Sequence, residues 1–128
     1  MLGTQFEYCG LVSGEKKNCF LRSLDLLVMP TFFEGLPMSF VECMSYGAVP
    51  VITPVGSIPT VVVNQQNGIF IKVKDVESIV EVITYLHTHR DRLEQMNKSS
   101  RNYILEHFDP EMYIDRLNNI YNNLRVES

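Results

Sequence analysis

Two carboxylates, Glu34 and Glu42, are the side chains of this sequence whose type and spacing best suit chemistry. Glu34 lies in a turn-rich segment, and Glu42 lies on a predicted helix with seven residues between the two acids. A carboxylate on a helix can accept hydrogen bonds from both hydroxyls of a vicinal diol, such as that of a ribose. Glu42 also has apolar neighbours, and an acid without a role is uncommon in such surroundings. The spacing alone is explained equally well by one exposed loop acid and one solvated helix acid.

The segment between the two acids runs from a loop into the start of a predicted helix. Unpaired N–H groups and the helix dipole attract anions at such a start. Gly35 lets the backbone approach a ligand closely, and Pro37 fits the first helical turn although it removes one donor. The segment is therefore a natural seat for a phosphate.

The elements that must position these residues alternate between strand and helix. Short apolar or β-branched runs bounded by turn residues predict strands over residues 6–12, 25–29, 49–53 and 69–73. Helical spacing and helix-end signals predict helices over residues 15–23, 38–46, 76–88, 91–107 and 110–125, while residues 60–64 fit a short helix or a strand. This order predicts a three-layer α/β fold, a Rossmann-like parallel sheet with flanking helices. Ligands of such sheets bind beyond the carboxyl ends of the strands, which here are Val12, Met29, Thr53 and Val73.

The composition is that of one ordinary globular domain. The chain has 128 residues, of which 45% are hydrophobic and 20% charged, and its net charge of -4 argues against general nucleic-acid binding. The three cysteines, Cys9, Cys19 and Cys43, show no metal-binding spacing and are expected to be reduced and partly buried in a cytoplasmic protein. No apolar run is long enough to span a membrane, and no signal peptide is recognisable.

Residues 30–56, read as PTFFEGLPMSFVECMSYGAVPVITPVG, resemble the signature of the retaining GT-B glycosyltransferases of the large family 4 type, the glycosyl transferases group 1. The flanking residues 6–12, 25–30 and 67–68 resemble two strands and a turn of that family. The matching positions within the signature are Glu34, Glu42, Met44, Gly47, Pro50, Val51 and Gly56. The resemblance implies a single partial domain over residues 1–128, the nucleotide-sugar-binding C-terminal part of a GT-B enzyme. Residues 1–75 would form its sheet region and residues 76–128 its C-terminal helices.

The resemblance also implies roles for individual residues. Glu34 would be the catalytic residue, near the transferred sugar and its hydroxyls, and Glu42 would bind the ribose hydroxyls of the donor. The reaction would transfer a hexosyl group from a UDP- or GDP-sugar to an acceptor hydroxyl with retention, in surface glycan or polysaccharide biosynthesis. Two groups of residues would contact the rest of the donor, namely Gly10, Leu11 and Val12 at the base, and Gly35, Leu36, Met38 and Ser39 at the diphosphate or sugar.

The resemblance further implies that no metal is needed, because protein groups would stabilise the leaving diphosphate. The acceptor, a glycan or a lipid-linked sugar, would bind to an N-terminal domain missing from this sequence, so the isolated chain should be inactive. The whole enzyme would have no nucleic-acid partner and is compatible with peripheral membrane association. An apolar stripe on the last helix would face that other domain, through Tyr113, Ile114, Leu117, Ile120 and Tyr121.

This sequence departs from the family pattern in several places. The family's basic pair that neutralises the diphosphate has no match, and Lys16, Lys17 and Arg22 are expected on a solvated helix face. Ser57 stands where the family has a second glycine, and Thr60 where it often has an acid. Two alternatives therefore stay open: a non-catalytic α/β nucleotide-binding or interaction module, and another nucleotide-sugar enzyme such as an epimerase or a starch-synthase-like transferase.

Overall fold

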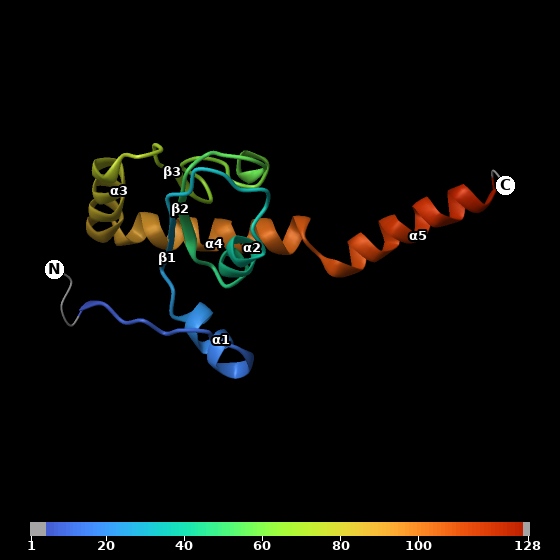
Figure 1. Ribbon diagram of the computed structural model, residues 1–128, viewed down its shortest axis with the longest axis horizontal. Helices are drawn as coiled ribbons and strands as arrows, with labels where there is room; N and C mark the ends of the chain where they lie inside the picture. Colours follow the sequence, from blue (N-terminus) through green and yellow to red (C-terminus); the bar gives the residue numbers. More distant parts are fainter. Residues whose placement is uncertain (1–4, 127–128) are drawn as a thin grey trace.

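The centre of the fold is a parallel sheet of three short strands in the order β1-β2-β3. A computed structural model describes residues 5–126 of the chain; residues 1–4 and 127–128, which belong to the predicted domain, lie outside the described part. The strands are β1 (Leu26–Met29), β2 (Val49–Ile52) and β3 (Ile69–Phe70) (Figure 1). Leu26 is paired with Val49, and Val51 with Ile69. All four residues of β2 are buried, as expected for the inner strand of a parallel sheet covered on both faces.

Helices α2 (Met38–Ser45) and α3 (Val76–Thr88) cover opposite faces of this sheet (Figure 1). Successive side chains of β2 alternate between the two faces, because a strand has a period of two residues. Val49 and Val51 pack in one core cluster with Leu86 of α3, whereas Ile52 packs in the other with Phe40 of α2. The predicted three-layer α/β fold is therefore confirmed.

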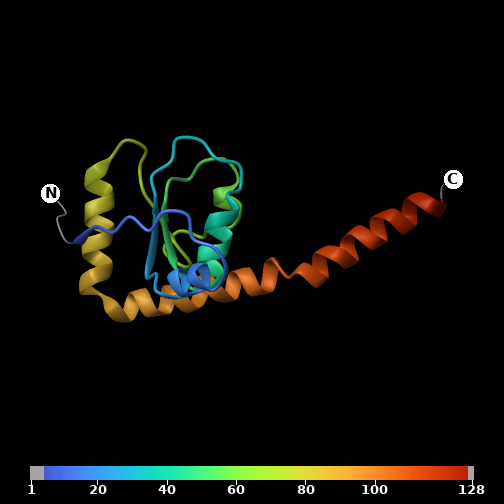
Figure 2. The ribbon, with the colours of Figure 1, turned by 60° about the horizontal axis from the view of Figure 1, so that its bottom comes forward.

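Helix α4 (Arg90–His107) crosses below the sheet and joins both core clusters (Figure 2). Its apolar residues Leu93 and Met96 pack with α3 and the sheet, and Ile104 packs with α2. Polar side chains fix it to the turn between α2 and β2. Asn97 donates from Nδ2 to the Gly47 carbonyl at 2.6 Å, and buried Ser100 donates to the Ala48 carbonyl at 2.9 Å.

The first and last helices lie at the periphery of the molecule. Helix α1 (Gly14–Arg22) leads into β1 and buries Leu21 against Cys43 and Ala48. Helix α5 (Pro110–Val126) projects away from the sheet (Figures 1 and 2), and most of its large apolar side chains are exposed. Within residues 5–126, no helix combines the length and the apolar character that crossing a membrane requires.

The predicted strand over residues 6–12 is wrong, because this segment is irregular and its side chains are largely exposed. A strand needs hydrogen-bonded neighbours, and β1 pairs only with β2 among the described strands. The predicted strand over 69–73 is reduced to two residues. Residues 58–60 form the short 3-10 helix η2 (Ile58–Thr60), slightly before the ambiguous segment 60–64.

Candidate functional site

Two loops that leave the carboxyl ends of β1 and β2 are joined by hydrogen bonds. The Thr53 hydroxyl donates to the Thr31 carbonyl at 2.5 Å, and the Ser57 N–H donates to the Gly35 carbonyl at 3.1 Å. Within the first loop, the Thr31 hydroxyl donates to Oε1 of Glu34 at 3.1 Å. The second loop therefore supports the backbone around Glu34, and the first loop orients its carboxylate.

The contact between these loops depends on a glycine. Gly56 has a φ of +57°, and a Cβ built on it would lie 1.9 Å from the carbonyl oxygen of Glu34. Only glycine combines the left-handed backbone with this close approach. Gly56 therefore sets how closely the second loop approaches the acid.

Helix α2 begins where the first loop ends. Its N-cap residue, Pro37, is extended and provides no side-chain cap. The N–H groups of Met38 and Ser39 precede the first hydrogen bonds of the helix, which Phe40 and Val41 donate to the Pro37 carbonyl. The start of α2 therefore offers free donors and the positive end of a helix dipole to an anion.

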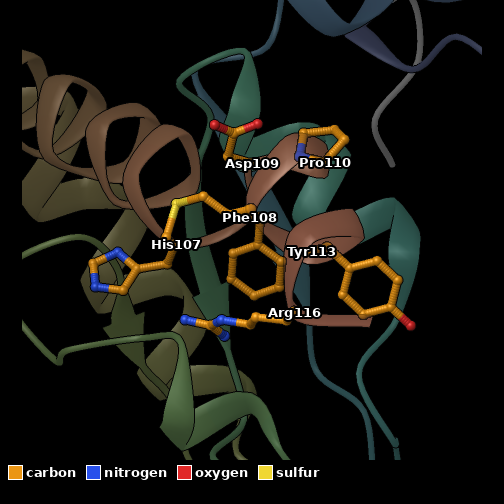
Figure 3. Close-up of a pocket in the computed structure, with 7 residues that line it drawn as sticks. His107, Phe108, Asp109, Pro110, Tyr113 and Arg116 are labelled. Atoms are coloured by element: carbon orange, nitrogen blue, oxygen red, sulfur yellow. The ribbon is translucent and has the colours of Figure 1, made fainter. Parts of the chain in front are cut away.

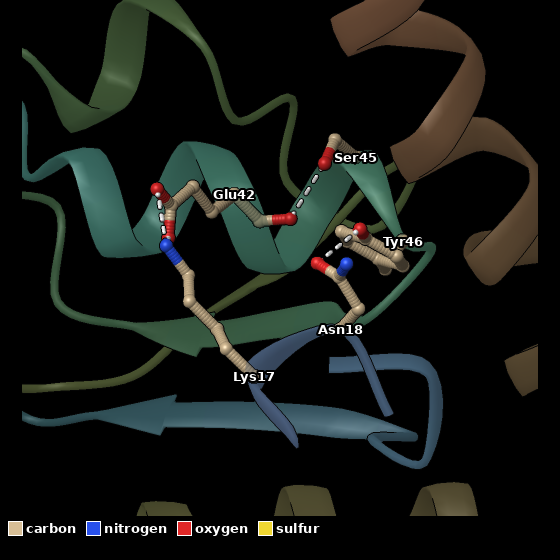
Figure 4. A network of polar contacts seen from close by, with 5 residues as sticks. All are labelled: Lys17, Asn18, Glu42, Ser45 and Tyr46. Atoms are coloured by element: carbon tan, nitrogen blue, oxygen red, sulfur yellow. Dashed lines mark hydrogen bonds and ion pairs between the residues drawn. The ribbon is translucent and has the colours of Figure 1, made fainter. Parts of the chain in front are cut away.

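Glu42, one turn further along α2, is held by an ammonium group from α1. Nζ of Lys17 lies 2.9 Å from Oε1 of Glu42 and 2.8 Å from Oε2 (Figure 4). A second polar contact joins the same helices, since the Tyr46 hydroxyl donates to Oδ1 of Asn18 at 3.0 Å. The Lys17 and Glu42 side chains are 38% and 41% exposed, so water and ligands can reach both.

A cavity of about 440 Å³ lies between α1, β1 and α2 and contains this ion pair. It gathers five of the residues predicted to bind the donor, namely Gly10, Leu11, Val12, Ser39 and Glu42. The other four predicted site residues, Glu34, Gly35, Leu36 and Met38, do not line it. Its walls are mainly apolar, and Ser39, Glu42 and Lys17 supply polar groups.

Lys17 lines this cavity although the sequence did not predict it as a site residue. It was expected on a solvated helix face, but it lines the cavity and pairs with Glu42. A signal was present in the sequence: Lys17, Phe20, Leu21 and Leu24 have helical spacing, and all four line the cavity. A lysine on the apolar face of an amphipathic helix indicates an anionic partner on the surface against which that helix packs.

The cysteines differ from the expectation of three partly buried thiols. Cys9 and Cys19 are exposed, and Cys43 is buried beside the cavity. Burial raises the pKa of the Cys43 thiol, the Glu42 carboxylate raises it further, and the Lys17 ammonium partly opposes them. In the described residues, no three His, Cys, Asp or Glu side chains gather as a metal site would require.

A second cavity, of about 400 Å³, lies at the junction of α4 and α5 (Figure 3). Its lining contains none of the predicted site residues. Its lining is mostly apolar and comes from the end of α4 and the first turns of α5, including Phe108, Tyr113 and Arg116. It is therefore separate from the candidate nucleotide site.

The chain is similar to glycosyltransferases over most of its length. The family model described as glycosyl transferases group 1 matches residues 1–103. A UDP-Gal:alpha-D-GlcNAc-diphosphoundecaprenol alpha-1,3-galactosyltransferase from Escherichia coli is 26% identical over 83% of this chain and 27% of its own length. A trehalose synthase from Thermococcus litoralis is 31% identical over 84% of this chain and 26% of its own length. The chain thus spans about a quarter of the length of these curated relatives.

Solved structures show the same fold. The sucrose-phosphate synthase of Thermosynechococcus elongatus matches 99% of this chain and 32% of that chain, with a TM-score of 0.90 and 18% identity. The C-terminal domain of a group 1 glycosyltransferase from Francisella tularensis matches 85% of this chain and 56% of that chain, with a TM-score of 0.75 and 18% identity. The chain therefore belongs to the glycosyl transferases group 1 and corresponds to part of the C-terminal domain of their GT-B fold.

Proposed function

We propose that this chain is the donor-binding part of a retaining glycosyltransferase that transfers a hexosyl group from a nucleotide sugar to an acceptor hydroxyl. The observation that carries the proposal is the cavity shared by Glu42, Ser39 and the segment 10–12. It combines a carboxylate suited to a ribose diol with apolar walls suited to a base. The start of α2 lies next to it and suits a diphosphate.

In this arrangement the donor extends along α2 towards the loop of Glu34. The ribose hydroxyls donate to Glu42, and the diphosphate accepts from the N–H groups at the start of the helix. The sugar then lies near the loop of Glu34, whose carboxylate is oriented by Thr31. The bond between the anomeric carbon and the diphosphate oxygen breaks, the acceptor oxygen bonds to that carbon on the same face, and the proton of the acceptor hydroxyl passes to the departing diphosphate. Backbone donors, rather than a metal ion, stabilise the leaving diphosphate.

The relatives support a sugar-transfer role and suggest the kind of substrates. The Escherichia coli relative is named for a UDP-Gal donor and an acceptor carried on a diphosphoundecaprenol. We infer a UDP- or GDP-sugar donor and a glycan or lipid-linked acceptor in the biosynthesis of surface polysaccharide. The acceptor would bind to a second domain, and the whole enzyme would act in the cytoplasm with peripheral membrane contact.

Titration with UDP, GDP and ADP, followed by backbone amide NMR shifts, tests the donor site. We expect saturable shifts at residues 10–12 and 36–42 for one of the three nucleotides, which identifies the base. Glu42→Ala should weaken binding about tenfold or more, because it removes the acceptor of two ribose hydroxyls. Glu106→Ala, which removes an exposed acid on α4, is the matched control and should change nothing.

If none of the three nucleotides causes saturable shifts at millimolar concentration, this chain does not bind a donor. The alternative of a non-catalytic interaction module would then be favoured over the donor-binding role.

A further inference from the structure

The position of the Lys17 ammonium group has a consequence for ligand binding at Glu42. Nζ lies at nearly equal distances, 2.9 and 2.8 Å, from the two carboxylate oxygens. It therefore occupies the edge of the carboxylate between both oxygens (Figure 4). A vicinal diol that donates one hydrogen bond to each oxygen needs the same edge. The ammonium group and the diol cannot both occupy it.

Lys17 is free to leave this position. Both side chains of the pair are more than one third exposed, so exchange with water or a ligand needs no opening of the core. Exposed ion pairs stabilise proteins little, because the side chains lose rotamer freedom and water screens the charges. Lysine also carries its charge on a flexible stem of four carbons, so the ammonium group can move by several ångströms.

The start of α2, where an anion would bind, lies within the distance over which the Lys17 ammonium group can move. Ser39 precedes Glu42 by three residues, so both project from the same face of α2, about 4.5 Å apart along the helix axis. Ser39 and Lys17 line the same cavity. A displaced ammonium group therefore remains beside the place where the phosphates of a nucleotide would bind.

We propose that Lys17 is an exchange cation of the nucleotide site, which holds the Glu42 carboxylate until the ribose hydroxyls displace it and then pairs with the phosphates of the same ligand. This inference rests on the proposed donor-binding function. Lys17 would supply a positive charge for the diphosphate from within this chain. The exchange would also make a complete nucleotide a better ligand than its nucleoside, because only the nucleotide offers the displaced ammonium group a new partner.

Binding of a nucleoside and of its 5′-diphosphate to Lys17→Met tests the exchange, with the base chosen as above. The nucleoside should bind to Lys17→Met as tightly as to the unaltered chain or up to about threefold more tightly, because nothing competes for Glu42. The 5′-diphosphate should bind about five- to tenfold more weakly, because the phosphates lose a charged partner. Lys17→Gln, which keeps a polar group without the charge, should give the same two signs.

Two control variants distinguish the exchange from a general effect of net charge and from a loosening of α1. Lys16→Met removes the same charge from an exposed neighbouring position and should change neither affinity by more than about twofold. Tyr46→Phe removes the other polar contact between α1 and α2, so it reports the effect of loosening α1 alone. Backbone amide spectra that retain the shifts of β2 and α4 establish that each variant is folded.

The remaining outcomes contradict either the exchange or the proposed donor-binding function. Equal weakening of nucleoside and 5′-diphosphate by Lys17→Met would mean that Lys17 only positions Glu42, and the exchange would be wrong. Unchanged affinities would make the pair a surface contact without a role in binding. If the unaltered chain binds no 5′-diphosphate, the proposed function itself fails; if it binds and Lys17→Met binds equally well, only the exchange fails.

Discussion

The carbonyl oxygen of Glu34 lies where a methyl group on Gly56 would have to go. Gly56→Ala should therefore push apart the two loops that carry the acid, and it adds a side chain at a φ of +57°. We expect a loss of about 2–4 kcal/mol in the free energy of unfolding. Chemical denaturation measures the loss, and amide shifts should change around residues 31–37.

Gly10→Ala is the matched control for this prediction. Gly10 has nearly the same backbone conformation, with a φ of +60°, but a Cβ there meets no atom within 4 Å. Its cost should be limited to backbone strain, about 1 kcal/mol. Equal losses for the two variants would show that strain, rather than contact with Glu34, explains the glycine.

The three cysteines should differ in their reaction with iodoacetamide. Cys9 and Cys19 are exposed, whereas Cys43 is only 5% exposed and its pKa is raised by burial and by Glu42. A raised pKa means less thiolate at any pH below it, and the thiolate is the form that reacts. Near pH 8, mass spectrometry should therefore find Cys43 alkylated last. In guanidinium chloride the three rates should converge, and a difference that persists there would contradict this explanation.

At the residue scale, the sequence points to Glu34 and Glu42 as candidate site residues but not to Lys17, the cation that pairs with Glu42. Glu42 could be predicted because its spacing from Glu34 matches a family signature. The contact with Lys17 joins residues 25 positions apart, on helices whose relative placement no local pattern specifies. The close contact between Gly56 and the loop of Glu34 could not be predicted either, because the sequence shows the glycine but not the carbonyl that approaches it.

Among the elements, α4 connects the layers, and its core residues should matter most for stability. Met96 is fully buried in the cluster with Val49, Val51 and Leu86. Met96→Ala should lower the free energy of unfolding by about 2–4 kcal/mol through lost burial and the cavity left behind. Ser99→Ala, at an exposed position of the same helix, should stay within about 0.5 kcal/mol. Thermal or denaturant unfolding compares the two, and similar losses would refute a central role for the α4 core.

Helices were more predictable than strands for a physical reason. The apolar positions of residues 76–88 repeat with the helical period, and Asp75 caps α3 by accepting from the Ser78 N–H at 3.0 Å. Such signals are local. The segment 6–12 has the composition of a strand, but its hydrogen bonds require a neighbouring strand, and composition cannot reveal whether one is paired there. The same dependence explains why the strand predicted over 69–73 is only two residues long.

At the scale of the whole molecule, α5 presents an apolar face that the rest of the chain leaves uncovered. Ile114 and Tyr121 are 54% and 62% exposed and lie on one side of the helix, seven residues apart. Exposed faces of this kind promote association. We expect the chain to self-associate with rising concentration in sedimentation velocity experiments, and Ile114→Glu with Tyr121→Glu to suppress this association.

The control for α5 places the same charges on its polar side. Asn119→Glu with Asn122→Glu changes the net charge equally but leaves the apolar face intact, so association should persist. A chain that stays monomeric at every concentration would contradict the expectation that this face seeks a partner.

The burial of β2 between two strands and two layers of helices also determines how the molecule opens with time. All four residues of β2 are buried and both its edges are paired, so its ladder amides cannot meet solvent without loss of the sheet. In α5, by contrast, each amide is protected by little more than its own turn of helix. In deuterated water, α5 should therefore exchange its amide hydrogens by local fraying, while the hydrogen-bonded amides of β2 exchange only when the whole domain unfolds. The exchange rate of the β2 amides would then report the rate of global unfolding. A bound donor nucleotide that stabilises the domain would lower this rate and leave the exchange of α5 unchanged.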